Sequence, residues 1–348
     1  QGLGGGGLIA LAFTVIADCI PPREVGKYQG YISAVYAVSS IAGPLLGGYF
    51  TEQLSWRWIF WINLPLGALA LWLVNRNLGH LNVRRHSRFD WKGAGLLITV
   101  TTLSLLLLSP ETTLSAIWLA AGLALALLLL ILVERRAQDP ILPAHLARLP
   151  GYLVSVLLAL ASQLLMFAVL VYLPLQMQWQ KGMGASESGL YMVIFMVCIT
   201  AGAFVGGKLI GRTGHYKRFV VAGFALAALA LWQIHFDLFA NLGLGFAGLG
   251  LGLVLPALSV VVQNALPRED RGIGMSLFNF GRELGGAVGV AICAMLFHGA
   301  LPAGTSHNLA SLSPAELAPG FSATYVGMAL IASAALLITL LALKRHEL

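Results

Sequence analysis

The sequence predicts an all-α polytopic membrane protein that crosses the bilayer about eleven times. Of its 348 residues, 58% are hydrophobic and only 10% are charged, whereas a soluble domain carries about 25% charged residues. The apolar residues form long continuous runs, and a helix needs about 20 such residues to cross the hydrocarbon core. Strands of a membrane barrel would instead be short segments of alternating polarity. This composition excludes an ordinary soluble enzyme, a disordered chain and a nucleic-acid-binding protein.

The expected spans follow one another with short polar connections. They are residues 1–20, 28–50, 57–75, 91–109, 114–133, 150–175, 187–210, 218–236, 238–262, 273–297 and 320–343. The longest hydrophilic gaps are residues 76–90, 134–149 and 298–319. None of these gaps is long enough for a soluble domain, since domains begin at about 50 residues.

The distribution of lysine and arginine predicts the orientation of these spans. If the connection after the first span is cytoplasmic and the sides alternate from there, 18 of the 21 basic residues lie on the cytoplasmic side. Only Arg57 and Lys181 lie on the opposite side, and Arg282 lies inside a span. Such a bias is typical of cytoplasmic loops. We therefore expect a cytoplasmic C-terminus, and the net charge of +7 needs no nucleic-acid partner.

The second span carries small residues at helical spacing. They are Gly30, Ser39, Gly43, Pro44, Gly47 and Gly48. Glycines four residues apart let another helix approach closely, and a proline bends a helix. A single pair of such glycines is usually ordinary packing. The longer pattern resembles the antiporter signature on the fifth helix of drug:proton antiporters of the major facilitator superfamily, with a serine at position 39 where that family usually has glycine.

Neighbouring segments extend this resemblance over essentially the whole chain. Residues 1–5 look like the end of the family's fourth-helix motif, and residues 55–67 resemble the start of the sixth helix in EmrB/QacA-type exporters with 14 helices. The resemblance implies a major-facilitator fold that lacks its first three helices. Residues 1–75 would then be the remainder of the N-terminal bundle, residues 76–149 a linker with two extra helices, and residues 150–348 the C-terminal six-helix bundle.

The connection between the seventh and eighth expected spans is strongly basic. It resembles the superfamily's cytoplasmic-loop motif, which implies a gating loop formed by Gly207, Arg212, Gly214, Lys217 and Arg218. However, a glycine stands at position 211, where an acidic residue often sits in the family. A second interpretation, a basic turn that only fixes the topology, therefore stays open.

Three ionisable residues fall within or near the ends of spans, where charge is costly and often functional. Asp18 lies close to the cytoplasmic end of the first span, with either a structural or a proton-coupling role. Arg282 and Glu283 lie roughly 15 Å into their span, at 1.5 Å per residue. Because adjacent helix positions diverge by about 100°, we expect no simple ion pair between them. They are interpreted either as structural charges or as a site of proton exchange.

Other polar residues in apolar runs are candidates for lining a substrate cavity. They are Asn63, Gln163, Tyr172, Gln176, Tyr191, Gln233 and Asn279. Each one alone fits an interhelical hydrogen bond, whereas as a group they suit a broad apolar cavity with few polar groups. The chain has no phosphate-binding loop, catalytic motif or metal-ligand spacing. We therefore expect no enzyme activity, no cofactor and no metal.

The resemblance implies proton-coupled efflux of drugs or other amphipathic small molecules by alternating access. The implied place is a bacterial inner membrane, as a monomer, with a periplasmic adaptor and an outer-membrane channel as optional partners. Two alternatives stay open. One is an exporter or importer of a single solute, such as an antibiotic, siderophore or sugar, on the same fold. The other is a non-transporting membrane protein, if the chain is naturally truncated.

Overall fold

The computed structural model describes residues 46–78, 90–109, 115–137, 140–149, 151–236, 240–267, 270–302 and 312–343, together with Gly4, Val35, Val38, Ser39, Ala42 and Gly43. Every regular element in these ranges is a helix. The expected span 1–20, apart from one residue, and most of the expected span 28–50 lie outside the described residues.

Nine helical segments in the described ranges are long and apolar enough to cross a membrane. The first joins α3 (Trp58–Trp61) and α4 (Asn63–Leu78), and the others are α5 (Trp91–Leu108), α6 (Ala116–Glu134), α7 (Tyr152–Trp179), α8 (Ala185–Thr213), α9 (Tyr216–His235), α10 (Ala240–Ala265), α11 (Arg271–Gly299) and α12 (Pro314–Ala342). Two short helical turns, η1 (Phe50–Leu54) and η3 (Leu146–Arg148), precede α3 and α7. The expected spans from 57–75 to 320–343 are thus confirmed as helices.

Several helices are longer than their apolar runs predict. α8, α11 and α12 have 29 residues each, which is about 43 Å at 1.5 Å per residue against a hydrocarbon core of about 30 Å. Such helices tilt or extend beyond the core. α12 begins at Pro314 instead of residue 320 because Ser313 and Glu316 form a capping box in front of the apolar run.

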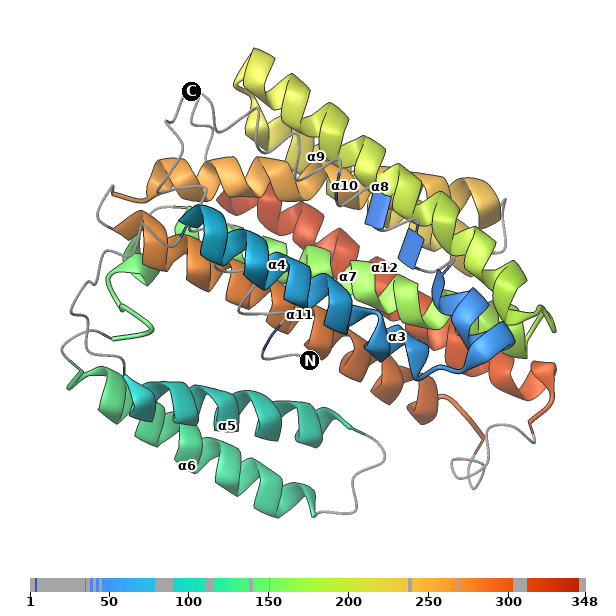
Figure 1. Cartoon of the computed structure of the whole chain (residues 1–348), viewed down its shortest axis with the longest axis horizontal. Coiled ribbons are helices and arrows are strands. Elements are labelled where there is room, and N and C mark those ends of the chain that lie inside the picture. Colours follow the sequence, from blue (N-terminus) through green and yellow to red (C-terminus); the bar gives the residue numbers. More distant parts are fainter. Residues whose placement is uncertain are drawn as a thin grey trace.

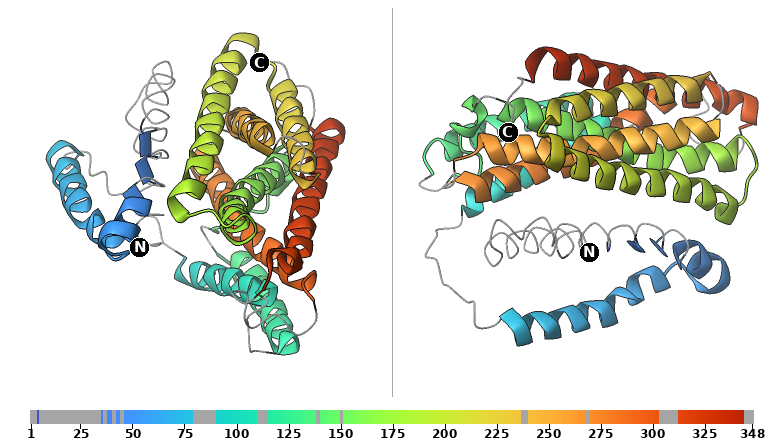
Figure 2. Two further views of the ribbon diagram at one scale, coloured as in Figure 1. Left: turned by 90° about the vertical axis from the view of Figure 1, so that its right-hand side faces the viewer. Right: turned by 90° about the horizontal axis from the view of Figure 1, so that it is seen from above.

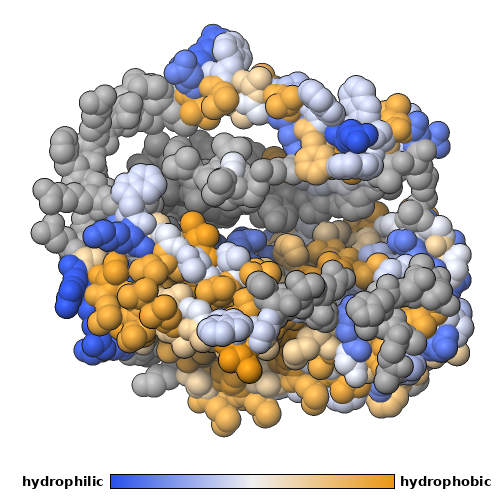
Figure 3. All heavy atoms as spheres, turned by 90° about the horizontal axis from the view of Figure 1, so that it is seen from below, coloured by the Kyte–Doolittle hydropathy of each residue, from blue (hydrophilic) through white to orange (hydrophobic). Residues whose placement is uncertain are grey.

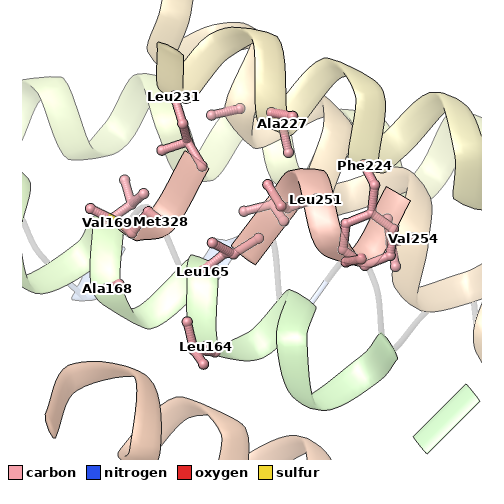
Figure 4. Packing of buried hydrophobic residues seen from close by; sticks show 14 of the residues in the cluster. Leu164, Leu165, Ala168, Val169, Phe224, Ala227, Leu231, Leu251, Val254 and Met328 are labelled. Carbon is pink, nitrogen blue, oxygen red and sulfur yellow. The ribbon is translucent and has the colours of Figure 1, made fainter. Parts of the chain in front are cut away.

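Helices α7 to α12 pack into one bundle, with α7 and α10 as its innermost members (Figures 1 and 2). α10 packs against α8 and α9, α11 packs against α7, and α12 packs mainly against α9 and α7. Figure 4 shows the core where these helices meet, with Leu165 and Val169 of α7, Phe224 of α9, Leu251 of α10 and Met328 of α12. Each of these side chains is at most 2% exposed.

Glycines on two faces of α10 allow close contact with both of its neighbours. A Cβ added at Gly248 would lie 2.6 Å from the carbonyl oxygen of Phe195 on α8. One added at Gly250 would lie 2.5 Å from the carbonyl oxygen of Gly223 on α9. The helix backbones therefore meet without side chains between them, which is how small residues bring membrane helices together.

The remaining described helices leave most of their apolar surface exposed. The span Trp58–Arg76 has no buried residue, and Figure 2 shows α3 and α4 to one side of the bundle. α5 and α6 form a hairpin, and α5 packs against α11. Large apolar side chains such as Leu71 and Trp118 are more than two-thirds exposed. In the lower half of Figure 3 apolar residues form a broad surface with hydrophilic residues toward its left and right edges, as expected for a surface that contacts lipid.

Candidate functional site: an intramembrane charged pair on α11

Arg282 and Glu283 form an ion pair near the middle of α11. The Nη2 atom of Arg282 donates to Oε1 of Glu283 over 2.8 Å. The expectation that these neighbours would not pair is therefore wrong. The helix directs their Cβ atoms apart, but the arginine side chain is long enough to reach around to the carboxylate.

The two partners differ in their exposure. The side chain of Arg282 is 20% exposed and that of Glu283 is 56% exposed. The Nε atom of Arg282 is buried and has no hydrogen-bond partner among the residues that the structure describes. The arginine is thus held inside the bundle and under-satisfied, while the carboxylate remains accessible.

α11 carries this pair on a backbone that packs directly against α7. A Cβ at Gly285 would collide with the carbonyl oxygen of Leu160, and one at Gly289 would lie 2.7 Å from the Cα of Leu164. At the start of both helices, the hydroxyl of Tyr152 donates to the carbonyl oxygen of Gly274 over 2.9 Å. The position of the charged pair is therefore fixed relative to α7.

α7 contributes a series of polar side chains to the interior of the bundle. Gln163 is 4% exposed, and its Oε1 atom has no hydrogen-bond partner in the described part of the chain. Tyr172 is buried with its ring centroid 6.0 Å from that of Phe297 on α11. Gln176 accepts a hydrogen bond from the hydroxyl of Tyr325 on α12 over 2.8 Å. Tyr325 was not among the residues predicted from the sequence, because it looks like any other tyrosine within an apolar run.

The other predicted cavity residues lie on separate helices. Asn63 on α4 is exposed and its amide donates to the carbonyl oxygen of Ile59 over 3.3 Å. Tyr191 on α8 is partly buried against the bundle core, and Asn279 on α11 is also partly buried. Gln233 on α9 is exposed. Three of the seven predicted cavity residues therefore lie along α7. The other four lie on different helices, and the described residues do not form one site that contains all seven.

The small-residue motif of the second span is described only in part. Ser39 and Gly43 are exposed, and a Cβ added at Gly43, Gly47 or Gly48 would meet no atom of the described residues within 4 Å. The predicted residues Gly30 and Pro44, and also Asp18, lie outside the described residues. Close helix packing at this motif therefore stays a prediction.

The basic loop between α8 and α9 contains one residue with a structural partner far along the chain. Gly214 ends α8 in a left-handed conformation with φ of 69°, and its amide donates to the carbonyl oxygen of Ile210 over 2.8 Å. The ammonium group of Lys217 donates to carbonyl oxygens at the end of α12. Gly207, Arg212 and Arg218, the other predicted members of the gating loop, are exposed. Their gating role stays a prediction.

Comparison with known proteins supports this architecture. Residues 1–290 match the model of the Major Facilitator Superfamily. The chain is 34% identical over 310 residues to an uncharacterized MFS-type transporter of Mycobacterium tuberculosis, an alignment that covers 85% of this chain and 45% of that protein. It is 32% identical over 303 residues to the multidrug transporter protein MdtP of Bacillus subtilis, covering 84% and 56% of the two chains. The chain therefore spans about half the length of these relatives.

A solved structure shows the same fold. The crystal structure of a bacterial homolog of the human lysosomal transporter Spinster, in an inward-facing and occupied conformation, aligns with a TM-score of 0.54 and 16% identity. The alignment covers 95% of this chain and 72% of that chain. At this identity the likeness concerns the fold alone.

These findings define the class of protein as a polytopic helical membrane protein with the fold of that transporter homolog. The chain belongs to the Major Facilitator Superfamily. The family and the relatives named here are transporters rather than enzymes, as the sequence predicted.

Proposed function

We propose that this chain acts in a secondary transporter that exports drugs or other amphipathic small molecules in exchange for protons, by alternating access. Membership of the superfamily and the similarity to a multidrug transporter support export of small molecules. The observation that carries the proton coupling is the ion pair of Arg282 and Glu283 within α11. Ionisable groups inside a membrane span are costly and are generally retained for function.

The pair offers a simple mechanism for coupling. When Glu283 is ionised, its carboxylate neutralises the partly buried guanidinium of Arg282. When Glu283 gains a proton, the arginine charge must find another acceptor or move toward water, because an unpaired buried charge is unfavourable. Either response shifts α11 or the side chains along α7. Proton binding would thereby bias the bundle between its two access states.

The proposal also covers subtype and location. The hairpin of α5 and α6 follows α4 in the sequence and precedes the bundle that begins with α7, which supports the 14-helix, EmrB/QacA-type arrangement. We place the protein in a bacterial cytoplasmic membrane, with its C-terminus in the cytoplasm. Its partners in this proposal are protons, a small-molecule substrate and the lipid bilayer, with a periplasmic adaptor and an outer-membrane channel as optional additions to a monomer.

The test uses the full-length protein expressed from its gene in everted membrane vesicles. Energised vesicles should transport a fluorescent cationic dye, and an uncoupler should stop this transport. Glu283→Gln should lower the proton-driven rate by about tenfold or more, which is about 1.4 kcal/mol in the limiting step. Glu187→Gln, which changes an exposed glutamate in the first turn of α8, serves as the matched control. If Glu283→Gln leaves the uncoupler-sensitive rate unchanged, the assignment of coupling to this residue is wrong.

The same assay separates a broad exporter from one that carries a single solute. A broad exporter transports several unrelated dyes, and these compete with one another for efflux. A single-solute transporter accepts none of them or only one.

A further inference from the structure

The span formed by α3 and α4 carries an arginine placed over a tryptophan ring at each of its ends. The guanidinium carbon of Arg57, just before α3, lies 5.2 Å from the ring centroid of Trp56. The guanidinium carbon of Arg76, in the last turn of α4, lies 5.2 Å from the ring centroid of Trp72. At this distance the face of the ring attracts the cation. Each ring therefore holds a guanidinium in place without an acceptor for its N–H groups.

Both guanidinium groups face the surroundings of the protein. The side chains of Arg57 and Arg76 are exposed, and the ion pairs within the described ranges join other residues. Glu52, whose side chain lies outside the described residues, is the only acidic residue within ten positions of Arg57. Residues 79–89, which follow Arg76, contain three further arginines and no acidic residue. Each end of the span thus presents positive charge that an anion from outside the chain can reach.

The separation of the two arginines matches the thickness of a bilayer. The span Trp58–Arg76 has 19 residues, none of them buried, and is about 28 Å long at 1.5 Å per residue. The hydrocarbon core of a bilayer is about 30 Å thick, and the headgroup layers extend it to about 40–45 Å. Because a long arginine side chain extends from the end of its helix toward the headgroups, each guanidinium reaches the depth of the lipid phosphates in one leaflet.

Aromatic side chains gather at the end of the span that carries Arg57. Trp56, Trp58, Phe60 and Trp61 are each at least 50% exposed, and the rings of Trp56 and Phe60 meet edge to face with their centroids 5.9 Å apart. Tryptophan is enriched where lipid meets water. In the orientation proposed above, Arg57 is one of only two basic residues on the outer side, against the usual bias. Its charge there therefore serves something other than topology.

We propose that Arg57 and Arg76 bind the phosphate groups of phospholipids, one in each leaflet, and thereby hold the α3–α4 span at a fixed depth in the bilayer. A planar guanidinium matches a phosphate with two parallel N–H···O bonds, and lipid phosphates are the anions present at both surfaces that this span connects. The tryptophan beneath each arginine restricts the rotation of the guanidinium and leaves its N–H groups directed to the headgroup. The proposal concerns lipid alone and depends on neither proton coupling nor substrate.

Native mass spectrometry of the full-length protein in detergent, titrated with dioleoyl phosphatidylglycerol, tests this binding. Arg57→Gln and Arg76→Gln should each remove one bound lipid or weaken its affinity about tenfold, the typical result of losing charged hydrogen bonds, and the double variant should lose both lipids. Lys181→Gln and Lys208→Gln are the matched controls, because both lysines are exposed and neither lies over an aromatic ring of the described residues. Equal lipid binding by wild type and the double variant would overturn the proposal, as would equal losses in the lysine variants.

Thermal unfolding with added lipid distinguishes phosphate recognition from general attraction to a membrane. Phosphatidylglycerol should raise the midpoint of the wild-type protein more than that of the double variant, whereas the phosphate-free lipid monogalactosyl diacylglycerol should affect both proteins equally. Replacing both arginines by lysine should restore only part of the difference, because lysine lacks the planar pair of donors. Since both arginines are exposed, all variants should unfold at the wild-type midpoint before lipid is added.

Trp56→Leu and Trp72→Leu test the role of the rings. Each should weaken the binding of phosphatidylglycerol, because the guanidinium loses the face that positions it, while the apolar character of the position is kept. Two results contradict a lipid anchor. One is a galactolipid effect that distinguishes wild type from the double variant as strongly as phosphatidylglycerol does. The other is an equal rise of the wild-type midpoint with inorganic phosphate alone, which would identify a site for free anions.

Discussion

Lys217 stabilises the end of a helix that lies 123 residues away in the sequence. Its Nζ atom donates to the carbonyl oxygen of Leu340 over 2.9 Å and also to that of Leu343. The last turn of α12 contains no basic residue. The last carbonyl groups of a helix have no hydrogen-bond donor within the helix, and they carry a partial negative charge. The ammonium group of the lysine supplies both the donors and the compensating positive charge.

This contact predicts a measurable loss on substitution. Lys217→Met should lower the free energy of unfolding of the chain by roughly 0.5–1.5 kcal/mol, the typical net contribution of a hydrogen bond, because the two bonds lie in exposed and part-buried surroundings. Lys217→Arg should recover part of that loss, and Lys208→Met should have little effect because this side chain is exposed. Thermal unfolding in detergent measures all three. Equal effects of Lys217→Met and Lys208→Met would show that the capping bonds do not matter for stability.

At the scale of residues, the sequence predicts which positions are unusual but not what they contact. Arg282 and Glu283 stand out because charged residues are rare in long apolar runs, yet their pairing depends on the reach of a flexible side chain. The bond between Tyr325 and Gln176 joins positions 149 residues apart.

Elements are easier to predict than contacts because membrane spans depend on the local property of apolar length. The expected spans from 57–75 onward all appear as helices. The largest shift is at α12, where the capping box of Ser313 and Glu316 starts the helix before its apolar run begins. The close packing of α10 was not predicted, although its alternating glycines at 248, 250 and 252 place small residues on two faces of one helix.

The glycine contact between α7 and α11 leads to a prediction at the scale of elements. Gly285→Ala should force the two helices apart, because its Cβ would collide with the carbonyl oxygen of Leu160. Overpacking of this kind typically costs about 1–3 kcal/mol. The matched control is Gly189→Ala on α8, where a Cβ would meet no atom within 4 Å, and alanine there should be neutral or favour the helix slightly.

Thermal midpoints of the two variants in the same detergent decide the question. A clear decrease for Gly285→Ala with no decrease for Gly189→Ala supports direct backbone contact between α7 and α11. The same substitution should also disturb the charged pair, since Arg282 and Glu283 lie less than one turn before this contact on α11. If both variants keep the wild-type midpoint, the two helices are less tightly packed than described.

At the scale of the whole molecule, the fold class could be predicted because it depends on properties spread over the entire chain, whereas the family was predicted from the resemblance of a few motifs. Composition, run length and the distribution of basic residues all indicate a helical bundle across a membrane. The family match and the structural neighbour agree with that prediction. The arrangement of a substrate site could not be predicted in this way, because it requires polar side chains from several helices to meet at one place.

Orientation is the remaining property of the whole molecule that the sequence predicts and that can be tested on intact cells. Lys181 lies between α7 and α8 and Arg212 lies at the other end of α8, so the basic-residue bias places them on opposite sides of the membrane. After replacement of Cys19, Cys198 and Cys293 by alanine, a membrane-impermeant thiol reagent should label Lys181→Cys but not Arg212→Cys in intact cells. Everted vesicles should show the reverse. Labelling of Arg212→Cys from outside would invert every loop and move the C-terminus out of the cytoplasm.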